Sequence, residues 1–204
     1  MDLYLEREIA LEKILELKGK DLREQAKFHG VTVFKDEKKN KGWAGHVIEK
    51  HLGLPLNSSS DPDFGDWELK VVPLKYLKTG RLAVKETMAV TMINPEDVRE
   101  KDFKNSHLKT KLNKVVIVAR IWENVEESRS LLHNAYMFDL TNKEIYNQIE
   151  EDYEIVRHAI ITKGFGSLTG KMGKIVQPRT KGAGHGSTSR AFYVRTSFLK
   201  NILL

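Results

Sequence analysis

Glu68 and Lys70 have the types and the spacing that metal-assisted hydrolysis of a phosphodiester requires. The residues around them alternate between apolar and charged, so a strand here places Glu68 and Lys70 on one face and Leu69 on the other. A carboxylate is a ligand that Mg²⁺ prefers, and such a cation polarises a phosphoryl oxygen and activates water. A neighbouring ammonium orients that water or neutralises the negative charge that develops. The segment therefore indicates a metal-dependent phosphodiesterase.

Two aspartates, Asp61 and Asp63, lie just upstream of this segment and are placed to converge on the same face. They supply the second carboxylate that holds a hard divalent cation. A plainer interpretation stays open, because a charged strand face is usually only solvated and Glu-x-Lys is common by chance.

The composition of the 204 residues is that of an ordinary globular protein, with 40% hydrophobic and 30% charged residues. This length is sufficient for one sizeable core, or for a core with a modest appended lobe. No apolar stretch is long enough to span a membrane, and the acidic, mixed N-terminus is unlike a signal peptide. The absence of cysteine excludes disulfides and cysteine zinc sites, and these features together favour a bacterial cytoplasmic protein without a membrane partner.

The formal net charge of +6 suggests a polyanionic partner, of which nucleic acid is the commonest. The basic residues gather in three stretches, at 35–41, 101–114 and 163–195. These stretches border the segments that carry the candidate chemistry, so the charge favours binding of nucleic acid beside the reaction site.

The pattern of apolar residues predicts a mixture of helices and strands, and hence an α/β or α+β fold. A glycine-rich, basic last third forms a lobe beside the sheet. A capping box at Thr141-Asn142-Lys143-Glu144 opens a long helix with an apolar stripe. The other helices are expected over 1–28, interrupted at Gly19, and over 42–52; strands are expected over 67–72, 82–93, 115–122, 135–140 and 191–194, with 115–122 as the buried central strand.

On the helix over 42–52, Gly42, Gly45 and Glu49 share one face. Small residues there allow close approach of a ligand or another element, and the Glu49 carboxylate stands above that surface. Exposure to solvent is the usual fate of a helix glutamate and stays open as the alternative.

Four segments, in order, resemble the MutH-like family of the PD-(D/E)xK superfamily, which contains a mismatch-repair nicking endonuclease and GATC-cutting type II restriction enzymes. They are a Lys-Gly-Trp-x-Gly-x-x-x-Glu pattern at 41–49, Asp61 with an Asp-x6-Glu-Leu-Lys spacing, a Ser-His-x-x-x-Lys-Leu pattern at 106–112, and Arg-x-Lys and Phe-Tyr elements at 177–181 and 191–194.

The resemblance implies a restriction-endonuclease-like mixed sheet flanked by helices, in one domain with a catalytic lobe of about 1–125 and a recognition lobe of about 126–204 around a DNA cleft. Asp61 and Glu68 would hold one or two Mg²⁺ ions with the Leu69 carbonyl, and Lys70 would serve the attacking water. The family spacing favours Asp61 over Asp63, which is the alternative ligand. Glu49 would be an additional active-site carboxylate.

The resemblance also implies contacts with DNA. Lys111 matches a lysine near the scissile phosphate, and Lys41 is expected at the DNA as well. Arg179, Lys181 and Tyr193 match the region that reads bases and senses adenine methylation, in keeping with the donor code of the major groove. Two departures from the family lie where sequence is read and partners are met: a short, glycine-rich loop between Lys181 and Arg190, and a C-terminus that ends soon after Phe198.

The sequence thus predicts a Mg²⁺-dependent, sequence-specific endonuclease that cuts double-stranded DNA at GATC-like sites and leaves a 5′-phosphate. The two departures favour a type II restriction enzyme, which would act as a homodimer on palindromic DNA. The alternative is a methyl-directed nicking enzyme of mismatch repair, which a partner ATPase activates. A catalytically inactive DNA-binding module is a second alternative, disfavoured because Asp61, Glu68, Lys70 and Glu49 are all retained.

Overall fold

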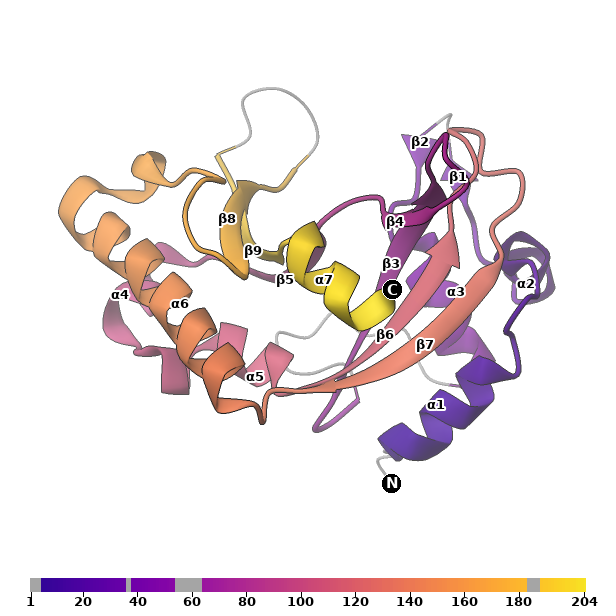
Figure 1. Cartoon of the computed structure of the whole chain (residues 1–204), viewed down its shortest axis with the longest axis horizontal. Helices are drawn as coiled ribbons and strands as arrows, with labels where there is room; N and C mark the ends of the chain where they lie inside the picture. The colour runs from indigo at the N-terminus through magenta and orange to yellow at the C-terminus, as the bar shows by residue number, and fades with distance from the viewer. Residues whose placement is uncertain (1–4, 36–37, 54–63, 183–187) are drawn as a thin grey trace.

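The apolar run after Asn113 forms a central strand of a four-stranded sheet, the larger of the two main sheets (Figure 1). A computed structural model describes residues 5–35, 38–53, 64–182 and 188–204. In it, β6 (Lys114–Ile121) pairs in parallel with β3 (Glu68–Tyr76) and antiparallel with β7 (Leu132–Asp139), and β4 (Leu82–Val84) completes the sheet beside β3. Every residue of β6 after Lys114 is buried, which confirms the predicted central strand.

The second sheet contains β5 (Met88–Met92), β9 (Arg190–Val194) and β8 (Val176–Thr180), in that order and antiparallel. The single strand predicted over 82–93 is therefore wrong, because β4 belongs to the first sheet and β5 to the second. Residues 85–87 cross from one sheet to the other. Continuous β-forming character does not reveal such a change of partner, since it describes local conformation only.

Three helices cover one face of the larger sheet (Figure 1). They are α1 (Arg7–Leu15), α2 (Leu22–Phe28) and α3 (Trp43–His51), and a short hairpin of β1 (Phe34–Lys35) and β2 (Lys38–Lys39) precedes α3. The predicted helix over 1–28 is two helices in its described part, with Gly19 at a φ of +77° between them. Their apolar side chains form a core with Leu69, Val116 and Val118 of the sheet.

A second core joins the opposite face of the larger sheet to the smaller sheet and the remaining helices. These are α4 (Pro95–Glu100), α5 (His107–Leu112), α6 (Lys143–Lys163) and α7 (Thr196–Leu203), with 3₁₀ turns at η1 (Phe103–Asn105) and η2 (Phe165–Ser167). Asn142 caps α6, because its side chain accepts hydrogen bonds from the N–H groups of Glu144 and Ile145. The predicted helix is therefore confirmed, but the capping box predicted to start at Thr141 is wrong. None of the helices in the described part of the chain is long and apolar enough to cross a membrane.

A buried aspartate fixes the loop that leads into β8. The Asp152 carboxylate, 1% exposed, accepts hydrogen bonds of 2.7 Å from the backbone N–H groups of Lys174, Ile175 and Val176. Arg195 donates to the carbonyls of three further residues of the same loop. Gly173, in the same loop, has a φ of +73°, and a Cβ at this position would stand 1.9 Å from the Val176 carbonyl oxygen. The start of β8 is therefore set by a carboxylate and by a position that requires glycine.

We expect Gly173→Ala to lower the free energy of unfolding by about 2–4 kcal/mol, because it combines a left-handed backbone with a clash. Urea denaturation measures this. Gly166→Ala is the matched control, since its backbone is ordinary and no atom lies within 4 Å of the added Cβ. Equal stabilities of the two variants would contradict the proposed role of Gly173.

Candidate active site and nucleic-acid interface

A groove with a volume of about 360 Å³ lies where the two sheets and α3 meet. Its walls come from β3, from the residues around the start of α3, from the crossing segment before β5, and from the end of β8. Four of the predicted site residues line it: Lys41, Glu49, Lys70 and Lys181. The fold therefore brings together residues from 41 to 181 that the sequence flagged separately.

Glu68 is buried, with 1% of its surface exposed, and two ammoniums neutralise it. Lys70 donates a hydrogen bond to Oε1, and Lys111 lies 3.2 Å from Oε1 and 3.0 Å from Oε2. The plainer interpretation of a solvated charged face is therefore wrong for Glu68. A buried carboxylate is tolerated only when it is paired in this way. With two cations for one described carboxylate, the cluster favours a further anion nearby.

The topology explains why Lys111 reaches Glu68. Glu68 opens β3 and lies opposite Val115 at the start of the parallel strand β6. The helix α5 ends just before β6, so its last turn stands beside the start of β3. Ser106 caps α5 by accepting a hydrogen bond from the Lys109 N–H, which fixes where the helix begins.

Lys181 brings a positive charge from the second sheet toward Lys70 on the first. Partial burial of its ammonium lowers the pKa of Lys181, and the positive charge of Lys70 lowers it further. Both side chains line the groove. Two like charges that approach each other across a groove favour an anion between them, which a phosphate of a nucleic acid supplies.

Arg179 and Tyr193 lie on neighbouring strands, β8 and β9, at the side of the groove. The Arg179 guanidinium stands 5.9 Å from the centre of the Tyr193 ring and donates a 3.0 Å hydrogen bond to the Thr87 hydroxyl. Burial raises the pKa of the Tyr193 hydroxyl, Arg179 opposes the increase and Glu86 adds to it. Glu86 and Thr87 also line the groove. Sequence analysis missed both, because they fall inside the single strand predicted over 82–93.

The remaining predicted ligands, Asp61 and Asp63, lie outside the described residues. Within the residues that the structure does describe, no three His, Cys, Asp or Glu side chains are grouped as metal ligands. Glu68 and the half-buried Glu49 supply oxygen donors, the type that suits Mg²⁺ rather than zinc.

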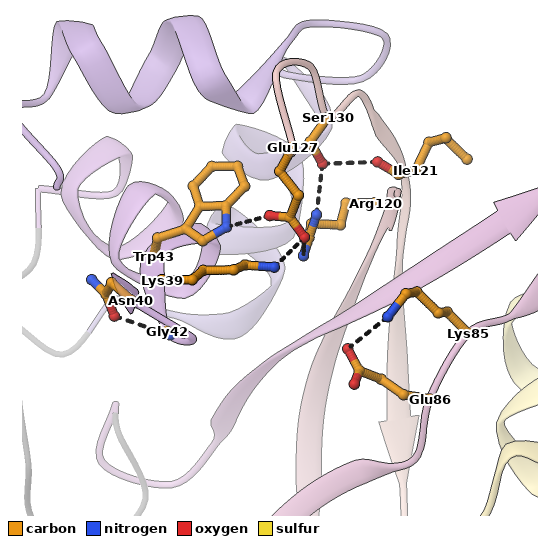
Figure 2. A network of polar contacts seen from close by, with 10 residues as sticks. All are labelled: Lys39, Asn40, Gly42, Trp43, Lys85, Glu86, Arg120, Ile121, Glu127 and Ser130. Atoms are coloured by element: carbon orange, nitrogen blue, oxygen red, sulfur yellow. Dashed lines mark hydrogen bonds and ion pairs between the residues drawn. The ribbon is translucent and has the colours of Figure 1, made fainter. Parts of the chain in front are cut away.

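A polar network behind the groove holds the start of α3 (Figure 2). The Glu127 carboxylate, in the loop between β6 and β7, accepts hydrogen bonds from Trp43, Lys39 and Arg120. Arg120 itself lines the groove, and its guanidinium lies 5.2 Å from the centre of the Trp43 ring. Sequence analysis gave no sign of Glu127, which stands among other acidic residues in a polar loop.

The closeness of Lys70 and Lys181 predicts that Lys70→Met raises the pKa of the Lys181 ammonium, because a repelling charge is removed. The pKa should still stay below its ordinary value, since burial is the larger cause. Titration of lysine side-chain signals by NMR measures the change, with Lys200→Met on α7 as the control. An unchanged pKa of Lys181 in Lys70→Met would show that the two ammoniums do not interact.

The chain is similar to known DNA endonucleases. The family model described as the DNA mismatch repair enzyme MutH matches residues 52–152. The DNA mismatch repair protein MutH of Vibrio cholerae is 29% identical over 214 residues, which cover 95% of this chain and 93% of that protein. MutH of Vibrio campbellii is 26% identical over 215 residues, which cover 95% of this chain and 91% of that protein.

The type II restriction enzyme Sau3AI of Staphylococcus aureus is 26% identical over 220 residues, which cover 100% of this chain and 43% of the enzyme. Among solved structures, the restriction endonuclease MvaI in complex with its cognate DNA aligns with a TM-score of 0.41 and 12% identity, over 99% of this chain and 97% of that chain. The family model and the sequence relatives bear out the resemblance to the MutH-like family of endonucleases that the four ordered motifs carry.

Proposed function

We propose that the protein is a Mg²⁺-dependent, sequence-specific endonuclease that hydrolyses double-stranded DNA and leaves a 5′-phosphate. The observation that carries the proposal is the buried Glu68 carboxylate between Lys70 and Lys111, beside a groove lined by Lys41, Glu49 and Lys181. Relatives named as a mismatch repair enzyme and as a restriction enzyme support the same class of reaction.

Glu68 and Asp61 would hold the cation, with Asp63 as the alternative to Asp61, and the Leu69 carbonyl and Glu49 would add oxygen donors. When bound, the cation supplies Lewis-acid polarisation of the scissile phosphate. Lys70, whose ammonium faces both Glu68 and the groove, would orient the attacking water. Lys111 would neutralise charge that develops on the phosphate.

In this proposal the two sheets have different roles, in catalysis and in the recognition of bases. Residues of a catalytic lobe, about 1–125, would act on the phosphate, and a recognition lobe, about 126–204, would read the bases. Arg179 and Lys181 are suited to guanine in the major groove, and Tyr193 lies in contact with Arg179. Lys41 would bind the DNA backbone from the opposite wall.

Among the biological settings we propose a type II restriction enzyme first, because the short, glycine-rich loop between Lys181 and Arg190 departs from the family where sequence is read. A restriction enzyme would cut both strands of a GATC-like palindrome as a homodimer. A methyl-directed nicking enzyme of mismatch repair, activated by a partner ATPase, is the second candidate. The match to Vibrio MutH over more than 90% of that protein favours it.

Incubation of the purified protein with Mg²⁺ and a supercoiled plasmid tests the proposal. The plasmid carries GATC sites in methylated or unmethylated form, and the ends are mapped. We expect linear fragments ending at GATC-like sites without any partner. Slow nicking of the unmethylated plasmid alone would replace this setting with mismatch repair.

Within that assay, Glu68→Ala and Lys70→Ala should each lower the cleavage rate about 100-fold or more, because the first removes a ligand of the cation and the second removes the ammonium that orients the attacking water. Binding of DNA in Ca²⁺, measured by fluorescence anisotropy, should stay close to that of the unmodified protein. Lys200→Ala, an exposed lysine on α7, is the control for loss of a positive charge. Cleavage by the two active-site variants at the normal rate would refute the assignment.

We expect a different outcome when the residues proposed to read the bases are substituted. Tyr193→Ala and Lys181→Ala should reduce discrimination against sites with one altered base pair, at a cost of about 1–3 kcal/mol for a lost base contact. Competitive cleavage of a library of near-GATC duplexes measures the preference. A uniform loss of rate on every duplex would instead assign these residues to the backbone.

A further inference from the structure

Glu127 combines two features that are unfavourable by themselves. Its side chain is 0% exposed, although the neighbouring Val125 in the same loop is 73% exposed. Its φ is 43°, and among the residues that the structure describes it is the only non-glycine residue with a positive φ. A non-glycine residue in the left-handed region costs about 1–2 kcal/mol. Backbone strain of this kind persists only where the surrounding contacts over-determine the conformation.

Those contacts come from three separate elements (Figure 2). The Trp43 indole N–H of α3 donates to Glu127 Oε2 at 2.8 Å, the Arg120 guanidinium of β6 donates to Oε1 at 3.1 Å, and the Lys39 ammonium of β2 donates to Oε1. Burial would raise the pKa of Glu127, but the hydrogen bonds from Lys39, Arg120 and Trp43 and the charge of Arg120 outweigh it and lower the pKa. The carboxylate is therefore ionised and satisfied.

The elements that carry Trp43, Arg120 and Lys39 differ in how they are connected to the groove. Trp43 is the first residue of α3, and a rigid helix fixes the direction of Glu49 six residues later, about 9 Å along the axis. Arg120 lies on β6 opposite Pro73 of β3, the strand that carries Glu68 and Lys70. Lys39 belongs to the hairpin before the helix. The bond between Trp43 and Glu127 thus joins the helix of Glu49 to the sheet of Lys70.

We propose that Glu127 is a positioning residue for the active site, whose buried carboxylate locks the first turn of α3, and with it Glu49 and Lys41, against the sheet that carries Lys70. This inference rests on the proposed nuclease function. Glu127 makes no contact with DNA in this role and acts only through Trp43 and Arg120.

Two variants that each remove one donor from the same carboxylate separate positioning from stabilisation. Trp43→Phe removes the hydrogen bond that joins Glu127 to the helix and leaves both ion pairs. Lys39→Met removes the ion pair that joins Glu127 to the hairpin. In single-turnover cleavage at saturating DNA, we expect Trp43→Phe to lower the rate constant about 10- to 100-fold, as misplacement of a catalytic group does. Lys39→Met should stay within about threefold of the unmodified protein, and DNA affinity in Ca²⁺ should change by no more than about threefold in either variant.

Glu127→Gln breaks the same bond from its other end. Its single amide oxygen will be held by Lys39 and Arg120, so the amide NH₂ will face the Trp43 N–H. We expect this variant to follow Trp43→Phe in rate, which separates the lost bond from the space left by the smaller ring. In the NMR spectrum of the three tryptophan indole N–H groups, one signal should shift in Glu127→Gln. Glu127→Ala is unsuitable, because it leaves Arg120 buried without a carboxylate.

Hydrogen exchange of the α3 amides provides a readout that does not require cleavage. Protection should fall in Trp43→Phe and Glu127→Gln and be retained in Lys39→Met. Equal rates in all variants, or losses that follow their stabilities alone, would overturn the inference, as would unchanged exchange in α3. Failure of the unmodified protein to cut any DNA would refute the proposed function instead, and the exchange data would still decide whether Glu127 holds the helix.

Discussion

The pairing of one buried carboxylate, Glu68, with Lys70 and Lys111 is the interaction on which the arrangement of the site depends. Taking a carboxylate out of water is tolerated only with such partners. Lys70 comes from the same strand, but Lys111 must be delivered from elsewhere. Because β3 and β6 are parallel, a crossover has to connect them, and it runs through β4, β5, α4, η1 and α5. The crossover thereby supplies the second cation and also the first strand of the smaller sheet.

The positions of the positive charges explain the preference of the groove for a polyanion better than the net charge does. Lys39 and Arg120 belong to the formal surplus of +6, yet both are committed to Glu127 inside the protein. Lys41, Lys70 and Lys181 line the groove instead, and Lys70 is paired with Glu68 at the same time. Burial lowers the pKa of Lys181 and the charge of Lys70 lowers it further, so these two ammoniums repel each other. A polyanion relieves that repulsion, which is why the groove suits DNA better than a neutral ligand.

Sequence reasoning succeeded where local pattern and chemistry coincide. The alternation at 67–72, the apolar run at 115–122 and the glycine-bearing helix at 42–52 are each recorded in neighbouring residues, and the structure confirms the elements that they predict. It failed where partners are distant. The strand over 82–93 divides between two sheets, and Glu127 meets Trp43 across 84 residues. Neither Glu86, Thr87 nor Glu127 carries a local signature, because long-range packing alone gives them their neighbours.

Two buried carboxylates outside the groove determine its walls. Glu127 holds the helix that carries Glu49, and Asp152 holds the loop that leads into the strand of Arg179. Asp152 accepts hydrogen bonds from three backbone N–H groups of that loop and from the Gln148 side chain, and Gly173 beside it must remain glycine. Glu127 is held by three side chains, Trp43, Lys39 and Arg120, of which Trp43 belongs to the helix itself. The wall that carries the proposed chemistry is thus held through side-chain partners, whereas the wall that carries base recognition is held mainly by backbone groups that meet Asp152 and Arg195.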